Sequence, residues 1–217
     1  MTSKQVMLAS VLFCLGGCEM FGSSKGADPL VSPYDQRHLW AVVPLRNESG
    51  SRYADGAAFA DDLVQQIEGA SNLDVLPVNR TLAALDALEM SHPSTYAEAM
   101  QLITTLDVDG LIVGTISAYD PYDPMKLGIA VDLYVHLDAD LPQRSRRPVV
   151  TSVSAFFNAG DPIVRDKLER YAHNRGSFAD RDSHVQYRIS MDLYSEFVAY
   201  IISWRLLDAE SKRVAQR

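Results

Sequence analysis

Two groups of residues in this chain have types and spacings that could do chemistry. Asp180, Asp182 and His184 occupy alternate positions, and together they could present oxygen and nitrogen ligands to a metal ion. Asp120 and Asp123 lie close together in the sequence and could act as paired carboxylates in acid–base catalysis. Metal binding and hydrolysis are therefore the two reactive chemistries to weigh first.

Each pattern also has a structural explanation, which we favour. Acidic residues beside His184 suit the amino end of a helix, where the helix dipole stabilises negative charge. Asp120 and Asp123 each precede a proline, and Asp-Pro pairs form turns whatever the function. Ser49 lies in a turn-like stretch without a nucleophile-elbow, P-loop or dinucleotide motif around it. We therefore expect no catalytic residue, no metal site and no cofactor, and hence a protein that is not an enzyme.

The residue with the clearest chemical role is Cys18, at the end of an amino-terminal leader. The leader has Lys4 near its start, the apolar run Val6–Leu15 and then two glycines. This layout is typical of a secretory signal with a small-residue cleavage site. A membrane-spanning helix needs about 20 apolar residues, far more than this run contains.

The residues Leu15, Gly16, Gly17 and Cys18 resemble the lipobox of bacterial lipoproteins. This resemblance implies that the leader, residues 1–17, is cleaved and that Cys18 carries acyl chains such as palmitate. The chain would then contact a membrane through an N-terminal lipid anchor. Glu19 is not the aspartate associated with inner-membrane retention in enteric bacteria, so we expect the outer membrane, with the domain facing the periplasm.

Composition limits the remaining classes of function. The formal net charge is −8, and removal of the leader with Lys4 makes it more negative, which argues against nucleic acid as a partner. Hydrophobic residues make up 47% of the chain, enough for one domain of about 200 residues to bury a core. Residues 19–37 mix Gly, Ser, Pro and charge. We expect a signal peptide at 1–17, a flexible tether at 18–37 and a single periplasmic α/β domain at 38–217.

The first half of the domain has the pattern of a parallel α/β unit. Residues 39–45 are almost all apolar, which is typical of a strand buried on both faces. Asp55, Asn79 and Ser94 are candidate N-caps for three helices. The expected order is strand 39–45, helix 56–69, strand 73–78, two helices starting near 79 and 94, and strand 111–116.

The second half changes period. Odd positions from Leu127 to Leu137 are apolar and the even ones are more polar, which predicts a strand, with 149–157 as its antiparallel return. A helix should begin after Asp161, and a long final helix should run over about 184–209 and cover the sheet. The predicted fold is α/β: a mixed sheet with a parallel βαβ(αα)β half followed by an antiparallel hairpin, packed by helices.

Several short motifs resemble one superfamily, which includes the amino-terminal domain of TolB, the lipoproteins of curli secretion and the lipoprotein activators of penicillin-binding proteins. The motifs are Trp40–Leu45, Asn47, Ser49–Gly50, Ala54–Gly56 and Val108–Gly114. The resemblance implies a periplasmic α/β domain without a catalytic centre, which binds other envelope proteins or itself.

The leading hypothesis is a lipoprotein that binds or assembles cell-envelope proteins. Its expected contact surface joins the loop after the first strand to the turn at 120–124, because loops carry function on such scaffolds. The residues singled out are Asn47, Ser49, Gly50, Tyr53, Asp120, Tyr122 and Asp123. The alternative is a subunit of an oligomeric outer-membrane secretion channel, in which the strands within 126–157 insert into the membrane.

Overall fold

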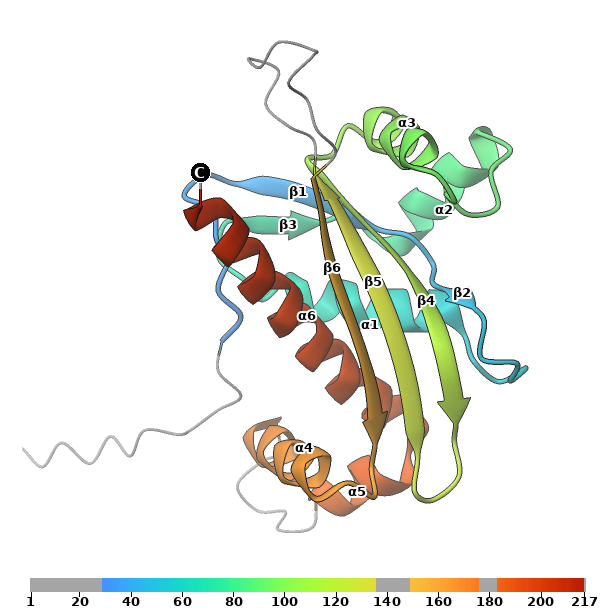
Figure 1. Ribbon diagram of the computed structural model, residues 1–217, viewed down its shortest axis with the longest axis vertical. Coiled ribbons are helices and arrows are strands. Elements are labelled where there is room, and N and C mark those ends of the chain that lie inside the picture. The colour runs from blue at the N-terminus through green and yellow to red at the C-terminus, as the bar shows by residue number, and fades with distance from the viewer. Residues whose placement is uncertain (1–28, 136–148, 176–182, 217) are drawn as a thin grey trace, which may run out of the picture.

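A single mixed sheet joins a parallel half of the chain to an antiparallel half (Figure 1). The computed structural model describes residues 29–135, 149–175 and 183–216. The sheet has the strand order β3-β1-β4-β5-β6, and the short strand β2 pairs with β4. The strands are β1 His38–Val42, β2 Arg46–Asn47, β3 Leu73–Val75, β4 Gly110–Asp120, β5 Lys126–Val135 and β6 Val149–Asn158.

The predicted fold class is confirmed. β1 pairs in parallel with β3 and β4, whereas β4, β5 and β6 form an antiparallel meander. Six helices surround this sheet in the described residues, and the last is the longest. They are α1 Gly56–Ile67, α2 Val78–Ala87, α3 Tyr96–Leu106, α4 Pro162–Arg175, α5 Ser183–Ile189 and α6 Met191–Ala215.

The strand β1, which lies between β3 and β4, is buried on both faces, as its continuous apolar run predicts. Trp40 and Val42 belong to the core between the sheet and the helices α1 and α6. Ala41 and Val43 belong to a second core, which α2 and α3 close. All four side chains are fully buried, so side chains that alternate along one strand supply both layers.

The expected strand 39–45 is wrong at its carboxyl end. β1 stops at Val42, and β2 follows as a separate short strand. Between the two strands, the Leu45 amide donates to the Gly56 carbonyl at 3.0 Å. A Cβ at Gly56 would lie 1.8 Å from the Leu45 carbonyl oxygen, so only glycine permits this close approach.

Of the three expected helix caps, one is confirmed and two are wrong. Asp55 Oδ1 accepts from the amides of Ala57 and Ala58, at 2.9 and 3.1 Å. α2 has Pro77 rather than Asn79 at its cap position. α3 is capped by Thr95 rather than Ser94, in a reciprocal capping box with Glu98.

The expected single final helix over 184–209 is wrong, because the chain forms two helices. Ser190 lies between α5 and α6 with an extended backbone, and its hydroxyl accepts from the Leu193 amide at 3.4 Å. The side chain therefore caps α6 instead of continuing α5. α6 packs against β5 and β6 as expected, but two apolar residues of the range 184–209, Ile189 and Trp204, are 76% and 46% exposed.

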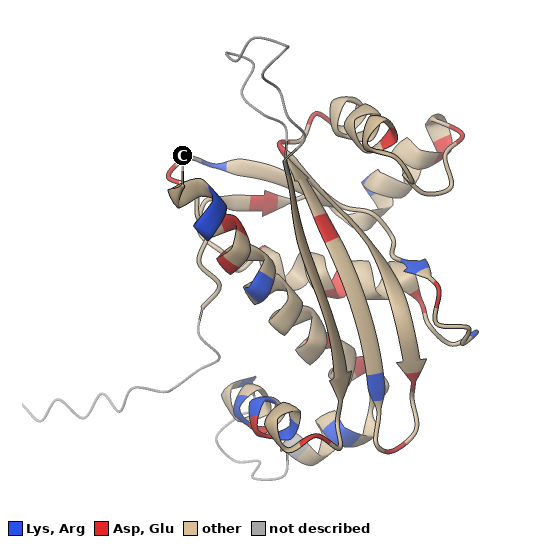
Figure 2. Cartoon of the chain, in the orientation of Figure 1, with Lys and Arg blue, Asp and Glu red and all other residues tan. Residues whose placement is uncertain are grey.

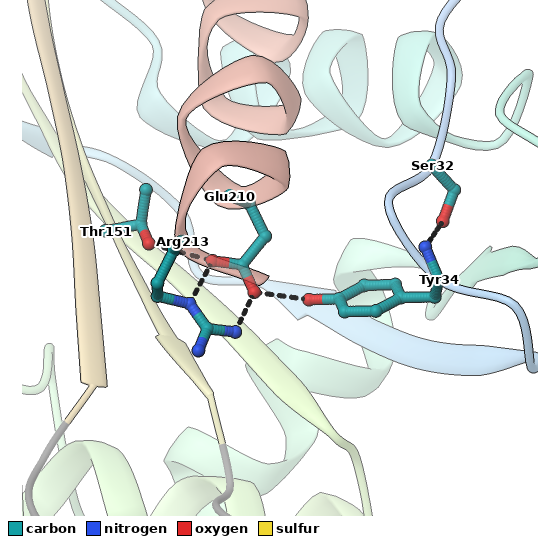
Figure 3. Close-up of polar contacts among 5 residues, drawn as sticks. All are labelled: Ser32, Tyr34, Thr151, Glu210 and Arg213. Carbon is teal, nitrogen blue, oxygen red and sulfur yellow. Dashed lines mark hydrogen bonds and ion pairs between the residues drawn. The ribbon is translucent and has the colours of Figure 1, made fainter. Parts of the chain in front are cut away.

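A buried carboxylate links the beginning and the end of the described chain (Figure 3). Glu210 on α6 is fully buried and accepts from the Tyr34 hydroxyl at 2.7 Å and from the Thr151 hydroxyl at 2.8 Å. Arg213 completes the site with an ion pair and a 2.7 Å hydrogen bond from Nε. Burial raises the pKa of Glu210, but the hydrogen bonds from Arg213, Tyr34 and Thr151 outweigh it, and the net pKa is lowered.

Residues 29–37, which we expected to belong to the tether, lie against the domain. Leu30 is buried in the larger core, and the Tyr34 ring packs edge-on against Trp40. In the part of the chain that the structure describes, no helix combines the length and the hydropathy needed to cross a membrane.

Candidate functional site

A pocket of about 280 Å³ opens where α1, the start of α6 and the end of β4 meet. Its floor is apolar and consists of Phe59, Ile116 and Leu127, all buried. This volume is just below the range of about 300–1,000 Å³ that is typical of pockets for drug-sized ligands. The pocket is therefore suited to a group about as large as one amino-acid side chain.

Carboxylates and tyrosines form the wall of the pocket. Asp62 comes from α1, while Asp192 and Glu196 come from the first two turns of α6. Tyr53 and Tyr119 add aromatic rings at the side of the β2–α1 loop and of β4. The combination of negative charge and aromatic faces is one that attracts an organic cation such as a lysine or arginine side chain.

Asp62 is the most perturbed carboxyl group of this pocket. Burial and the nearby charges of Glu196, Asp192 and Asp61 together raise its pKa to about 7. Within the described residues, no hydrogen bond or ion pair reaches its carboxylate. A cation that entered the pocket would favour the ionised form of this carboxyl group.

Arginines of the described chain contact residues that line this pocket. Arg52 Nη2 donates to the Tyr53 hydroxyl at 2.7 Å, and its guanidinium lies 4.9 Å from the centre of the Tyr53 ring. Arg175 Nη1 lies 3.7 Å from the Glu196 carboxylate, and its Nη2 donates to Gln66 Oε1 at 2.7 Å. Its guanidinium also stacks over the ring of Tyr171, 5.0 Å from the centroid. Three contacts hold Arg175 at the rim, and it does not line the pocket.

The β2–α1 loop, which we predicted as a binding loop, is held in shape by its own side chains. Asn47 Nδ2 donates to the carbonyls of Ser51 and Ala54, at 2.7 and 3.2 Å. The Ser49 hydroxyl donates to Asn47 Oδ1 at 2.7 Å, and Gly50 takes a φ of 74° at the tip. Because these groups bond within the loop, the loop supports Tyr53, which lies near its end.

Pairing between β2 and β4 places this loop next to the end of β4. Arg46 and Asn47 pair with Thr115 and Ile116. As a result, Tyr53 from the loop and Tyr119 from β4 line the same pocket. Burial raises the pKa of Tyr119, and the charges of Asp192 and Asp55 add to the rise.

The turn at 120–124 adjoins the pocket without lining it. Asp120 accepts from Lys126 Nζ at 2.9 Å and from the Tyr122 amide at 3.2 Å. These two hydrogen bonds lower the pKa of Asp120, so it is unsuited to act as a general acid at neutral pH. Tyr122 is 73% exposed beside it, and Asp123 precedes Pro124 in a cis peptide bond.

The other candidate residues lie outside this pocket or outside the described chain. Asp180 and Asp182, with the side chain of His184, fall outside the described residues, as do Leu15, Gly16, Gly17 and Cys18. Among the side chains that the structure describes, no group of three or more His, Cys, Asp and Glu residues could hold a metal ion.

The carboxylates of the pocket were missed at the level of sequence. Asp62 lies beside Phe59 and Leu63, which belong to the apolar stripe of α1. An acidic residue next to such a stripe indicates a partly buried carboxylate, because the position lies at the border of the face that packs on the core. Asp192 and Glu196 form an i,i+4 pair of like charges, which is a second signal of the same kind.

No family model and no curated protein matches the sequence. Solved structures with a similar fold include the C-terminal domain of LpoB from Salmonella enterica, at 10% identity and a TM-score of 0.40, over 59% of this chain and 86% of that one. Lipoprotein GNA1162 from Neisseria meningitidis matches at 16% identity and a TM-score of 0.35, over 56% and 80% of the two chains. PelC from Paraburkholderia phytofirmans, solved as a dodecamer, matches at 12% identity and a TM-score of 0.37, over 83% and 91%. At these identities the likeness concerns the fold alone.

Proposed function

We propose that this chain is a membrane-anchored lipoprotein of the bacterial envelope and that its α/β domain is a non-enzymatic binding module for another envelope protein. The lipobox-like residues ending at Cys18 support the anchor, and Glu19 supports the outer membrane, with the domain in the periplasm. The observation that carries the binding role is the pocket that Asp62, Asp192 and Tyr119 line.

The chemistry of the pocket identifies the kind of partner. Among the described residues, no Lys or Arg lines the cavity beside its carboxylates, and its tyrosine rings can contact the flat or methylene parts of a basic side chain. We therefore propose that the partner inserts a lysine or arginine between Asp62 and the tyrosines. The exposed Tyr122 and the β2–α1 loop would contact the surface around that residue.

Binding of a short basic peptide tests this role. We would titrate the full chain, in mild detergent, with acetyl-Gly-Arg-Gly-amide and acetyl-Gly-Lys-Gly-amide, and follow the change in tyrosine fluorescence. Asp62→Asn and Asp192→Asn should each weaken binding about tenfold, since each removes an ionic contact worth about 1.4 kcal/mol. Asp86→Asn, an exposed carboxylate on α2, is the matched control and should change nothing. Equal binding by all four proteins, or no binding, would overturn the pocket as the recognition site.

The same titration has a predicted pH dependence. The raised pKa of Asp62 reflects burial first and then the charges of Glu196, Asp192 and Asp61. Arg175 forms an ion pair with one of these groups, Glu196. Because the carboxyl ionises as the pH passes about 7, peptide affinity should rise between pH 6 and pH 8. The rise should disappear in Asp62→Asn, which has no proton to lose at that position.

The anchor requires its own test, so that its failure can be told apart from failure of the pocket. Mass spectrometry of the native amino terminus should show a diacylglycerol thioether on Cys18. The Cys18→Ser variant should be lost from the membrane fraction, and it should bind the peptides with unchanged affinity. An unmodified amino terminus would remove the proposed location and leave the binding role standing.

The channel alternative remains a prediction. In this fold the apolar side of β5 is already covered, because Leu127, Val131 and Leu133 lie in the core that α6 closes. We therefore propose the binding module rather than the channel subunit.

A further inference from the structure

Among the strands that the structure describes, β6 is the last at one edge of the sheet, with none paired beyond it. Within the described chain, β6 pairs with β5 only, from Val149 to Asn158. Apart from its pairing with β5, one backbone hydrogen bond from the described residues reaches β6: the Asp161 amide donates to the carbonyl of Asn158, the last residue of the strand, at 2.9 Å. Figure 1 shows it as the last strand of the meander. Every second backbone N–H and C=O of β6 therefore points away from the sheet and is available to another strand.

This edge lacks the features that normally prevent strands from pairing with other molecules. Protein edges are usually protected by charged side chains, by proline or by being very short. β6 is ten residues long and contains no charged residue and no proline, and Figure 2 shows no Lys, Arg, Asp or Glu along it. An unprotected edge of this length is suited to pairing with a further strand.

The exposed apolar side chains of β6 are placed symmetrically about its centre. Val150 is 40% exposed and Phe156 is 60% exposed, and both lie on the face opposite the larger core. Val153 lies midway between them in sequence, three residues from each. In an antiparallel pair, residues directly opposite each other lie on the same face of the sheet.

We propose that β6 pairs antiparallel with β6 of a second copy of this chain, with the two-fold axis at Val153. In this register Phe156 of each copy lies opposite Val150 of the other. The dimer therefore contains two equivalent pairs, and each exposed apolar side chain contacts one from the second copy. Aromatic and β-branched residues are a favourable cross-strand pair. A two-fold axis is also the commonest symmetry of protein dimers.

The remaining pairs in this register are compatible with each other. Ser152 lies opposite Ser154 of the second copy, and both are exposed in one copy alone. Thr151 lies opposite Ala155 on the face toward the core. No pair places like charges together, because β6 carries none. The pairing depends on neither the lipid anchor nor the acidic pocket.

Cysteine crosslinking tests the register directly. Two differently tagged full-length chains, one Ser152→Cys and the other Ser154→Cys, would be mixed in mild detergent and oxidised with copper phenanthroline. The opposed Cα atoms would lie about 4.5–5.5 Å apart, which is within the range of a disulfide. We expect a crosslinked heterodimer in the mixture. Neither variant alone should crosslink, since its two equivalent cysteines lie on a diagonal about 7–8 Å apart.

Sedimentation equilibrium of the same full-length chain gives a second readout. Phe156→Lys should raise the dissociation constant of the dimer at least tenfold, because it replaces an apolar contact and places a charge on the edge. Leu82→Lys, an exposed apolar residue on α2, should leave the constant unchanged. A monomer at every concentration, a closed ring larger than a dimer, or equal crosslinking by the single variants would overturn the proposal.

Discussion

Replacing Asp62 by asparagine should stabilise the protein, and the gain should depend on pH. The pKa of Asp62 rises from 3.8 to about 7 on folding. Below pH about 4 both states hold the proton, so the carboxyl group does not affect the free energy of unfolding. Between about pH 4 and pH 7 the folded state retains a proton that the unfolded chain releases, so stability falls as the pH rises. Above pH 7 the penalty is complete and constant.

The size of the effect follows from that change in pKa. A full rise from 3.8 to about 7 would correspond to about 4 kcal/mol. Asp62 is only half-buried, and solvent screens its repulsion from the other carboxylates, so about 1–2 kcal/mol remains. We therefore expect Asp62→Asn to unfold at higher urea concentration than the natural chain at pH 8, and at nearly the same concentration at pH 4.5.

Urea unfolding, followed by circular dichroism at both pH values, measures this difference. Asp86→Asn is the matched control: Asp86 is an exposed carboxylate on α2 that does not contribute to the pKa of Asp62, and its replacement should change stability by less than about 0.5 kcal/mol. Equal stability of Asp62→Asn and the natural chain at pH 8, or a gain of the same size at both pH values, would refute the reasoning about burial and repulsion.

Three further substitutions test the fold. Glu210→Gln should destabilise the protein by about 2–3 kcal/mol at pH 7 in urea unfolding, because a charged acceptor is lost from a buried site. Asp208→Asn, on the surface of the same helix, is the control and should change the stability little. Since the pKa of Glu210 is lowered on folding, its stabilising effect should be lost as the pH falls through that lowered pKa, and the two curves should converge in acid. Gly56→Ala should lower the melting temperature strongly through its clash with a backbone carbonyl, while Gly69→Ala, whose Cβ would lie 3.4 Å from its nearest neighbour, should be tolerated. Thr95→Ala removes half of the capping box and should cost about 1 kcal/mol in a calorimetric scan.

The parts of the fold that depend on short-range pattern could be predicted from the sequence. The apolar run around Trp40 indicates burial on both faces, and Asp55 precedes a helical pattern that it does cap. The break at Ser190 could not be predicted in this way, because apolar residues continue at helical spacing on both sides of it. The choice between a helical position and a cap depends on where α6 meets the sheet, which is a long-range property.

One residue that lines the pocket had been singled out from the sequence. Tyr53 was expected on a binding loop, and the structure places it at a pocket. Asp62 could not be assigned to the same site from sequence, because its neighbours in space, Asp192 and Glu196, are more than a hundred residues away along the chain. The sequence pattern also could not predict that Glu210 is buried with hydrogen-bond partners, because Tyr34 and Thr151 come from distant segments of the chain.

The contact between Tyr34 and Glu210 has a mechanical consequence if the protein is anchored to a membrane. If Cys18 is held in a membrane, a force on the amino-terminal segment acts on the domain first at Leu30 and Tyr34. The hydrogen bond from the Tyr34 hydroxyl to Glu210 then transmits this force to the last turns of α6. Residues 18–28 precede that point in the sequence, and a chain of this length spans at most about 36 Å when fully extended. The distance from the membrane at which the domain could meet a partner would then depend on the contacts of Leu30 and Tyr34 with the domain.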